Sequence, residues 1–74
     1  MVYTNEMEVN SMANNLRRIR TDLGISQTEL AEKSGVSRQT IIKIESDSST
    51  PVKTSTLVKI AEVLKRPVAD IFFS

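Results

Sequence analysis

Apolar residues recur along much of this chain at intervals of three or four positions, which is the spacing of one face of an α-helix. The first such segment contains Leu16, Ile19 and Leu23, and Gly24 directly after it supplies the left-handed conformation in which many helices end. The pattern therefore predicts a helix over about residues 12–23.

Two more helices are predicted directly after the first, with a very short connection between them. Ser26 and Glu29 have the spacing of a capping box, in which each side chain satisfies a free amide at the start of a helix. This second helix ends at Gly35, only two residues before Ser37, which caps the third helix. We expect Gly35 to adopt a positive φ in this turn, because glycine tolerates that conformation at little cost.

The helix that begins near Ser37 has two contrasting faces. Ile41 and Ile44 form an apolar face directed at the core, while Ile42 either points outward or is partly buried. The outward residues are polar and rich in hydrogen-bond donors, and they are Arg38, Gln39, Thr40 and Lys43. The sequence thus predicts a helix that is held by its inner face and presents a polar outer surface.

The second half of the chain predicts two further helices after a loop of turn-forming residues at 46–51. Pro67 fits the first turn of the last and shortest helix, where its missing N–H is not needed. The apolar residues of these two helices are Leu57, Ile60, Ala61, Leu64, Val68, Ile71 and Phe72. The predicted fold class is all-α, a compact five-helix bundle with short connections.

Residues 1–11 differ in character from the rest. Tyr3, Met7 and Val9 alternate weakly with polar residues, and Glu6 and Glu8 are acidic. This favours a flexible tail, because a single strand is not stable alone; the alternative is one edge strand that pairs with a partner chain. We therefore expect an N-terminal tail over 1–11 and one domain over 12–74.

Composition narrows the range of functions. The chain has 74 residues, which fits a single domain, and contains no cysteine and no histidine. Disulfides, thiolate chemistry, histidine acid–base catalysis and nearly every zinc site are thereby excluded, so we expect no enzyme activity, no cofactor and no metal. No apolar run approaches the roughly 20 residues of a membrane span, which favours a cytoplasmic protein.

Charge is distributed unevenly along the chain. Its formal net charge is +1, but Glu6 and Glu8 give residues 1–11 a charge of −2 and leave residues 12–74 at +3. The predicted domain is therefore mildly basic, which is compatible with nucleic-acid binding without being diagnostic of it.

One long motif makes the pattern specific. The run L-G-I-S-Q-T-E-L-A-E-K-S-G-V-S-R-Q-T-I-I-K-I-E at residues 23–45 resembles the phage repressor and Cro family, also called the Xre type. The run A-E-V-L-K-R-P-V-A-D-I-F at residues 61–72 resembles the last two helices of that family, so the likeness covers about residues 14–73. It implies a helix-turn-helix whose second helix enters a DNA major groove about 12 Å wide.

The resemblance also implies roles for individual residues. Arg38, Gln39, Thr40 and Lys43 would face base edges, where Arg or Lys pairs with guanine and Gln with adenine. Arg20 and Glu45 would form a partly buried, structural ion pair. Contacts to DNA phosphates are expected from Gln27, Thr28, Ser37, Ser46 and Lys53.

One loop departs from the family pattern. Where family members commonly have a glycine followed by basic residues, this chain has Asp47, Ser48, Ser49 and Thr50. Phosphate contact through this loop is therefore disfavoured, because the charge of Asp47 repels a DNA backbone.

The function that these features predict is a sequence-specific transcriptional regulator, a repressor, bound as a homodimer to a palindromic operator in double-stranded DNA. Ile71, Phe72 and Phe73 are candidate dimer contacts, although Phe72 could equally complete the core and leave Phe73 alone at the surface. The alternative is a protein-interaction module or antitoxin that uses the same fold to bind a protein partner. The scarcity of basic residues in the 47–50 loop favours that alternative slightly.

Overall fold

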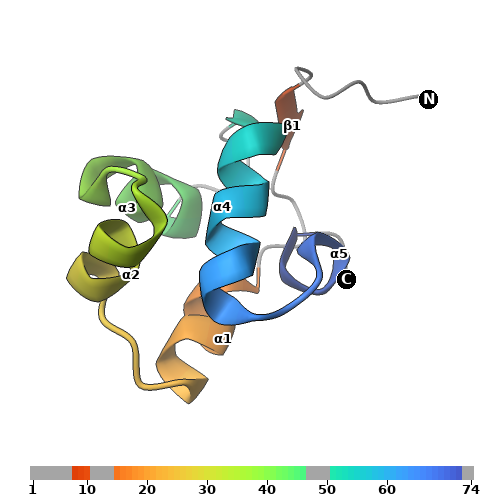
Figure 1. Ribbon diagram of the computed structural model, residues 1–74. Coiled ribbons are helices and arrows are strands. Elements are labelled where there is room, and N and C mark those ends of the chain that lie inside the picture. Colours follow the sequence, from red (N-terminus) through yellow and green to blue (C-terminus); the bar gives the residue numbers. More distant parts are fainter. Residues whose placement is uncertain (1–7, 11–14, 47–50, 73–74) are drawn as a thin grey trace.

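The computed structural model describes residues 8–10, 15–46 and 51–72. They form the helices α1 (Leu16–Asp22), α2 (Gln27–Ser34), α3 (Arg38–Ser46), α4 (Thr54–Leu64) and α5 (Val68–Phe72), and the strands β1 (Glu8–Asn10) and β2 (Pro51–Lys53). In Figure 1, α4 lies between the α2–α3 pair and α5. Among these residues, no helix combines the length and the apolar character needed to cross a membrane. The predicted five helices are confirmed.

The ends of the first two helices follow the local signals in the sequence. Gly24 has a φ of +72° directly beyond the last turn of α1. α1 begins at Leu16, and residues 12–14 of the predicted helix lie outside the described residues. At the start of α2, the Oγ of Ser26 accepts a hydrogen bond from the amide of Glu29 at 3.0 Å. The carboxylate of Glu29 pairs with Lys33 at 2.8 Å, which replaces the second bond of the expected capping box.

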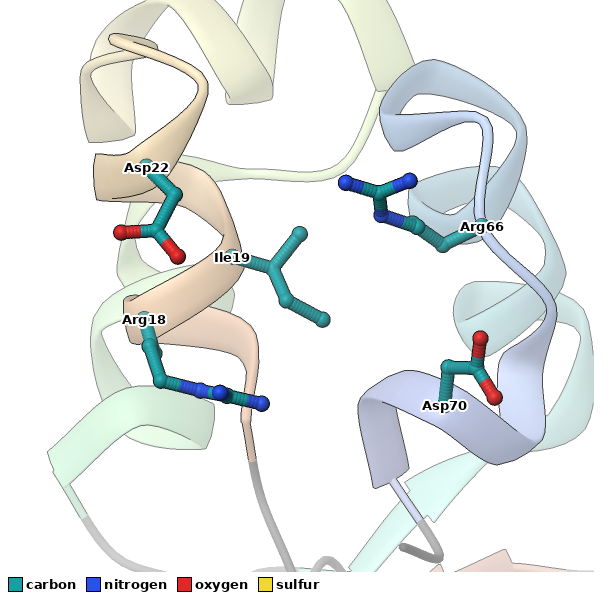
Figure 2. A pocket seen from close by; sticks show the side chains of 5 residues that line it. All are labelled: Arg18, Ile19, Asp22, Arg66 and Asp70. Carbon is teal, nitrogen blue, oxygen red and sulfur yellow. The ribbon is translucent and has the colours of Figure 1, made fainter.

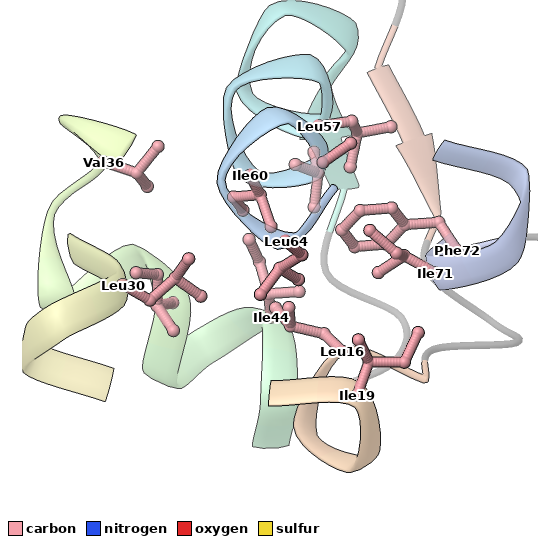
Figure 3. Packing of buried hydrophobic residues seen from close by; sticks show 13 residues of the cluster. Leu16, Ile19, Leu30, Val36, Ile44, Leu57, Ile60, Leu64, Ile71 and Phe72 are labelled. Atoms are coloured by element: carbon pink, nitrogen blue, oxygen red, sulfur yellow. The ribbon is translucent and has the colours of Figure 1, made fainter. Parts of the chain in front are cut away.

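The core collects apolar side chains from all five helices (Figure 3). Along α4 the buried residues Leu57, Ile60, Ala61 and Leu64 follow the three-and-four spacing, so the inner face is buried while the outer face stays in water, whereas α2 contributes Leu30 and the partly buried Ala31. The fully buried side chains that fill most of this space are Phe72, Leu16, Leu30, Ile41, Ile44, Leu57, Ile60 and Ile71. One continuous core therefore holds all of the helices in place.

The two strands are where the structure departs from the sequence prediction. β1 pairs antiparallel with β2, with Val9 opposite Val52. The described part of the N-terminal segment is thus a short edge strand, and it pairs within its own chain, which the sequence pattern did not predict. Of the loop predicted at 46–51, Ser46 belongs to α3 and Pro51 to β2, and the residues between them lie outside the described residues. Burial of Val52, which is only 4% exposed, anchors β2 to the core.

The C-terminal dimer candidates are also placed differently from the first expectation. Ile71 and Phe72 are 0% and 1% exposed, so neither presents a surface to a second chain. The amide of Asn15 donates to the carbonyl of Ile71 at 2.7 Å, which ties α5 to the start of α1. Phe72 completes the core, as the alternative expectation had it, and Phe73 lies outside the described residues.

Candidate nucleic-acid interface

The connection between α2 and α3 is a tight glycine turn. Gly35 has a φ of +76°, and its amide donates to the carbonyl of Ala31 at 2.9 Å, which closes the last turn of α2. The amide of Val36 donates to the Oγ of Ser34 at 3.2 Å. Val36 itself is buried. The turn is therefore fixed both by backbone geometry and by an apolar anchor.

Ser37 caps α3, as the sequence indicates. Its Oγ accepts a hydrogen bond from the amide of Thr40 at 3.1 Å and lies 2.7 Å from the hydroxyl of Thr40. The hydroxyl of Thr40 is thereby engaged within the protein, and the residue is half-buried. Its methyl group and the remaining hydrogen-bonding capacity of its hydroxyl are left for contact with another molecule.

The outer face of α3 is polar and open to solvent. Arg38, Gln39 and Lys43 are exposed, whereas Ile41 and Ile44 on the opposite face are 0% and 1% exposed. Because the inner face is locked into the core, the three exposed side chains project from a helix with a fixed position. This arrangement allows hydrogen-bond donors to reach the floor of a groove that admits a helix.

A buried ion pair connects α1 to α3. The Nε of Arg20 donates to Glu45 at 2.7 Å and a terminal guanidinium nitrogen donates to its other carboxylate oxygen at 2.9 Å. The remaining terminal nitrogen donates to the carbonyl of Ile25 at 2.9 Å. The side chains of Arg20 and Glu45 are only 10% and 4% exposed. The pair thus fixes α1, the following turn and α3 relative to one another.

The ion pair extends to a third side chain at the start of α2. The side-chain amide of Gln27 donates to Glu45 at 3.1 Å, so the same carboxylate accepts from two different helices. The hydrogen bonds from Arg20 to Glu45 raise the pKa of Arg20 above its ordinary value, against the opposing effect of burial. The guanidinium of Arg20 therefore stays charged. One N–H of the Gln27 side chain donates to Glu45, and its other N–H can donate to another molecule.

Three of the five residues expected to contact phosphate, Gln27, Ser46 and Lys53, line two hollows that flank α3, and the exposed Ser37 lines neither hollow. The first has a volume of about 320 Å³ and lies where α1, α2 and α3 meet. Its lining includes Gln27 and Ser46, and Ile42 forms part of its wall in a half-buried position. Thr28 is exposed on α2 but does not line this hollow.

The second hollow, of about 270 Å³, separates α3 from β2 and the start of α4. Lys43 and Lys53 line it together with the hydroxyl-bearing Thr40 and Thr56, over a floor that includes Val52. The structure therefore brings Lys53 to the same hollow as Lys43 on the outer face of α3, although the two are ten positions apart in sequence. Both hollows combine cationic and hydroxyl or amide donors, which is the chemistry of phosphate contacts.

Two residues that the sequence did not place among the site residues also line these hollows. Arg17 borders the first hollow, and its position three residues before Arg20 was an available signal, because residues at this spacing are neighbours on a helix surface. Thr56 borders the second hollow. No local pattern in the sequence marked Thr56, because the hollow forms only where β2 and the start of α4 lie against α3. The 47–50 loop lies outside the described residues.

Comparison with known proteins gives one consistent result. A helix-turn-helix family model matches residues 16–71. A protein of Methanothermobacter thermautotrophicus named "Uncharacterized HTH-type transcriptional regulator" is 43% identical over 58 residues, which cover 77% of this chain and 83% of that protein. A protein of Archaeoglobus fulgidus with the same name is 36% identical over 61 residues, covering 82% and 86% of the two chains. This chain therefore belongs to the helix-turn-helix family of the phage repressor and Cro (Xre) type.

Proposed function

We propose that this protein is a sequence-specific transcriptional repressor that binds double-stranded DNA through the major groove. The observation that carries the proposal is the outer face of α3, where Arg38, Gln39 and Lys43 are exposed while the inner face is locked in the core. A protein seated on an operator obstructs the transcription machinery, so repression is the simplest effect of such binding.

In this proposal the exposed face of α3 selects the base sequence. Arg38 and Lys43 pair with guanine, and Gln39 pairs with adenine, each good pair contributing about 1–3 kcal/mol of discrimination. Thr40 contacts a thymine through its methyl group, while its hydroxyl stays hydrogen-bonded to Ser37.

The two hollows beside α3 hold the DNA backbone. Gln27 and Ser46 contact a phosphate at the first hollow, and Lys53 contacts one at the second. Thr28 and Ser37, exposed near the starts of α2 and α3, supply further donors to the same strands. These contacts set the position of α3 without carrying sequence information.

The operator is proposed to be palindromic and bound by a homodimer. One domain of this size offers few base contacts, and two copies would double them on half-sites about 34 Å apart. Ile71 and Phe72 are buried, so the contact between the two copies is proposed to use other residues, and Phe73 stays a candidate outside the described residues.

A salt titration of DNA binding tests the proposal. Each phosphate contact releases counterions, so log K is expected to fall with log salt with a slope of about −0.9 per contact. Gln39→Ala should change which sequences are preferred, whereas Lys53→Ala should weaken all sequences alike and make the slope shallower by about one contact. Lys59→Ala, on an exposed position of α4 outside both hollows, is the matched control and should change neither.

Selection of bound sites from random DNA would then give the operator. Two half-sites with centres 10–10.5 base pairs apart are expected for a dimer, or a multiple of that spacing. Binding that ignores salt, or a Gln39→Ala variant with unchanged sequence ranking, would contradict the proposal. Salt-independent binding would instead favour the protein-interaction or antitoxin alternative.

A further inference from the structure

A charged groove runs between α1 and the chain around α5, away from the candidate DNA surface. It has a volume of about 280 Å³ and is lined by Arg18, Ile19, Asp22, Arg66 and Asp70. Figure 2 shows Asp22 and Arg66 facing each other across one end of the groove, with Ile19 between the two walls. The groove therefore has an apolar floor and two walls, each carrying an acid and a base.

Three of the charged side chains that line this groove take part in no ion pair with another described residue. In the part of the chain that the structure describes, the side chains of Arg18, Asp22 and Arg66 form no ion pair. Asp22 and Arg66 are both exposed and lie on opposite walls. Each thus has its charge available for a second molecule.

An exposed apolar side chain adjoins the same groove. Leu23 is 43% exposed, and its amide donates to the carbonyl of Ile19 at 3.1 Å, so it lies one helical turn beyond the groove floor. Among the described residues, the other large apolar side chain with this exposure is Val58 on α4. Protein interfaces combine an apolar centre with a polar rim, and Leu23 beside Asp22 and Arg66 offers both.

We propose that this groove is the contact between two copies of the chain. Leu23 of each copy packs over Ile19 in the groove of the other, and Asp22 of each copy pairs with Arg66 of the other. The inference rests on the homodimer of the proposed function and names the surface that forms it.

Charge complementarity identifies the occupant as a second copy. A two-fold axis brings the same patch onto itself, so Asp22 and Arg66 of one copy can each meet the opposite charge on the other copy. A nucleic acid or a uniformly acidic partner would instead meet the carboxylate of Asp22. In Figure 1 α4 lies between α5 and the α2–α3 pair, so such a contact leaves the outer face of α3 free.

A charge-exchange experiment tests the pairing directly. Sedimentation velocity of the full chain should show self-association in the micromolar range, because the patch is small. Asp22→Lys and Arg66→Glu should each weaken it at least tenfold, since like charges then face each other twice across the two-fold axis. A mixture of the two variants should form a heterodimer, in which the reversed charges are complementary again.

Control variants separate this contact from a loss of folding. Leu23→Lys should also weaken association, whereas Val58→Lys, with the same 43% exposure on α4, should leave it unchanged. Circular dichroism of each variant shows whether it is folded. The inference is overturned if the unaltered chain stays monomeric throughout the micromolar range, if the single variants associate normally, or if the mixture fails to associate.

The same samples distinguish this inference from the proposed function. A chain that binds DNA with the expected salt slope but stays monomeric overturns the contact and leaves the DNA-binding proposal standing. A chain that dimerises through the groove but does not bind DNA overturns the DNA-binding proposal and leaves the contact standing.

Discussion

Replacing Glu45 by glutamine would test whether the buried ion pair holds the helices in place. The two side chains have the same shape, so no cavity forms, but the variant removes the negative charge that receives the guanidinium of Arg20 at 2.7 and 2.9 Å. The side chain of Arg20 is only 10% exposed, so water cannot take over the role of the carboxylate. Breaking such a pair from one side costs about 3–5 kcal/mol.

That loss is large for a domain of this size. Native domains are stable by about 5–15 kcal/mol, so Glu45→Gln should remove a substantial part of the free energy of unfolding. At about 4–8 °C per kcal/mol, the midpoint of thermal unfolding should fall by more than 10 °C. Gln27, which donates to the same carboxylate at 3.1 Å, should lose part of its ordering as well.

Urea unfolding followed by circular dichroism measures the effect. Glu62→Gln, at an exposed position on α4, is the matched control and should change the free energy of unfolding by no more than about 0.5 kcal/mol. The double replacement Arg20→Met with Glu45→Leu should regain most of the loss, because it removes both buried charges. If Glu45→Gln lowered the free energy of unfolding by less than about 1 kcal/mol, the carboxylate of Glu45 would not be needed to compensate the buried charge of Arg20.

Four further outcomes follow from the geometry. Gly35→Ala should cost about 1–2 kcal/mol of stability in urea unfolding from the φ of +76° alone, since no atom lies within 4 Å of the added methyl; a larger loss would indicate a clash that the structure does not contain. Phe72→Ala should cost about 3–5 kcal/mol and not act through self-association, because Phe72 is 1% exposed; unchanged stability with weakened association would restore it as a dimer contact. Ser37→Ala should cost about 1 kcal/mol through loss of the cap on α3, and unchanged thermal stability would show that the hydrogen bond to the Thr40 amide contributes nothing. Because the pKa of Arg20 is raised in the folded chain, its contribution to the free energy of unfolding is fully present at any pH below the pKa of the unfolded chain, and the unaltered chain should lose none of it up to about pH 11. In Arg20→Lys the free energy of unfolding should fall further above about pH 10, and equal dependence on alkaline pH in the two chains would contradict this.

The parts of the fold that the sequence predicted correctly are governed by short-range interactions. The Ser26 cap involves a residue three positions away, and Gly35 adopts its positive φ in a turn of a few residues. Apolar periodicity likewise marks one face of each helix without reference to the rest of the chain. The helix-turn-helix and the exposed face of α3 could therefore be predicted from local patterns.

The parts that the sequence left open or predicted differently depend on contacts between distant segments. β1 pairs with β2 across most of the chain, and no local pattern marked either strand as the partner of the other. Phe72 could have been a surface or a core residue until α5 was seen to be packed against the rest of the molecule. The hydrogen bond from Gln27 to Glu45 joins two helices whose relative position the sequence alone does not specify.

The sequence by itself determined the helices, their caps and which face of each is apolar, because these properties arise from residues within one or two turns of each other. Only the tertiary structure decided which polar side chains meet. Lys43 and Lys53 line one hollow, and Asp22 faces Arg66 across another, because core packing sets where each helix lies. Burial depends on the summed packing of the whole chain, and so the surfaces that we propose for DNA and for a second copy form only when the core is complete.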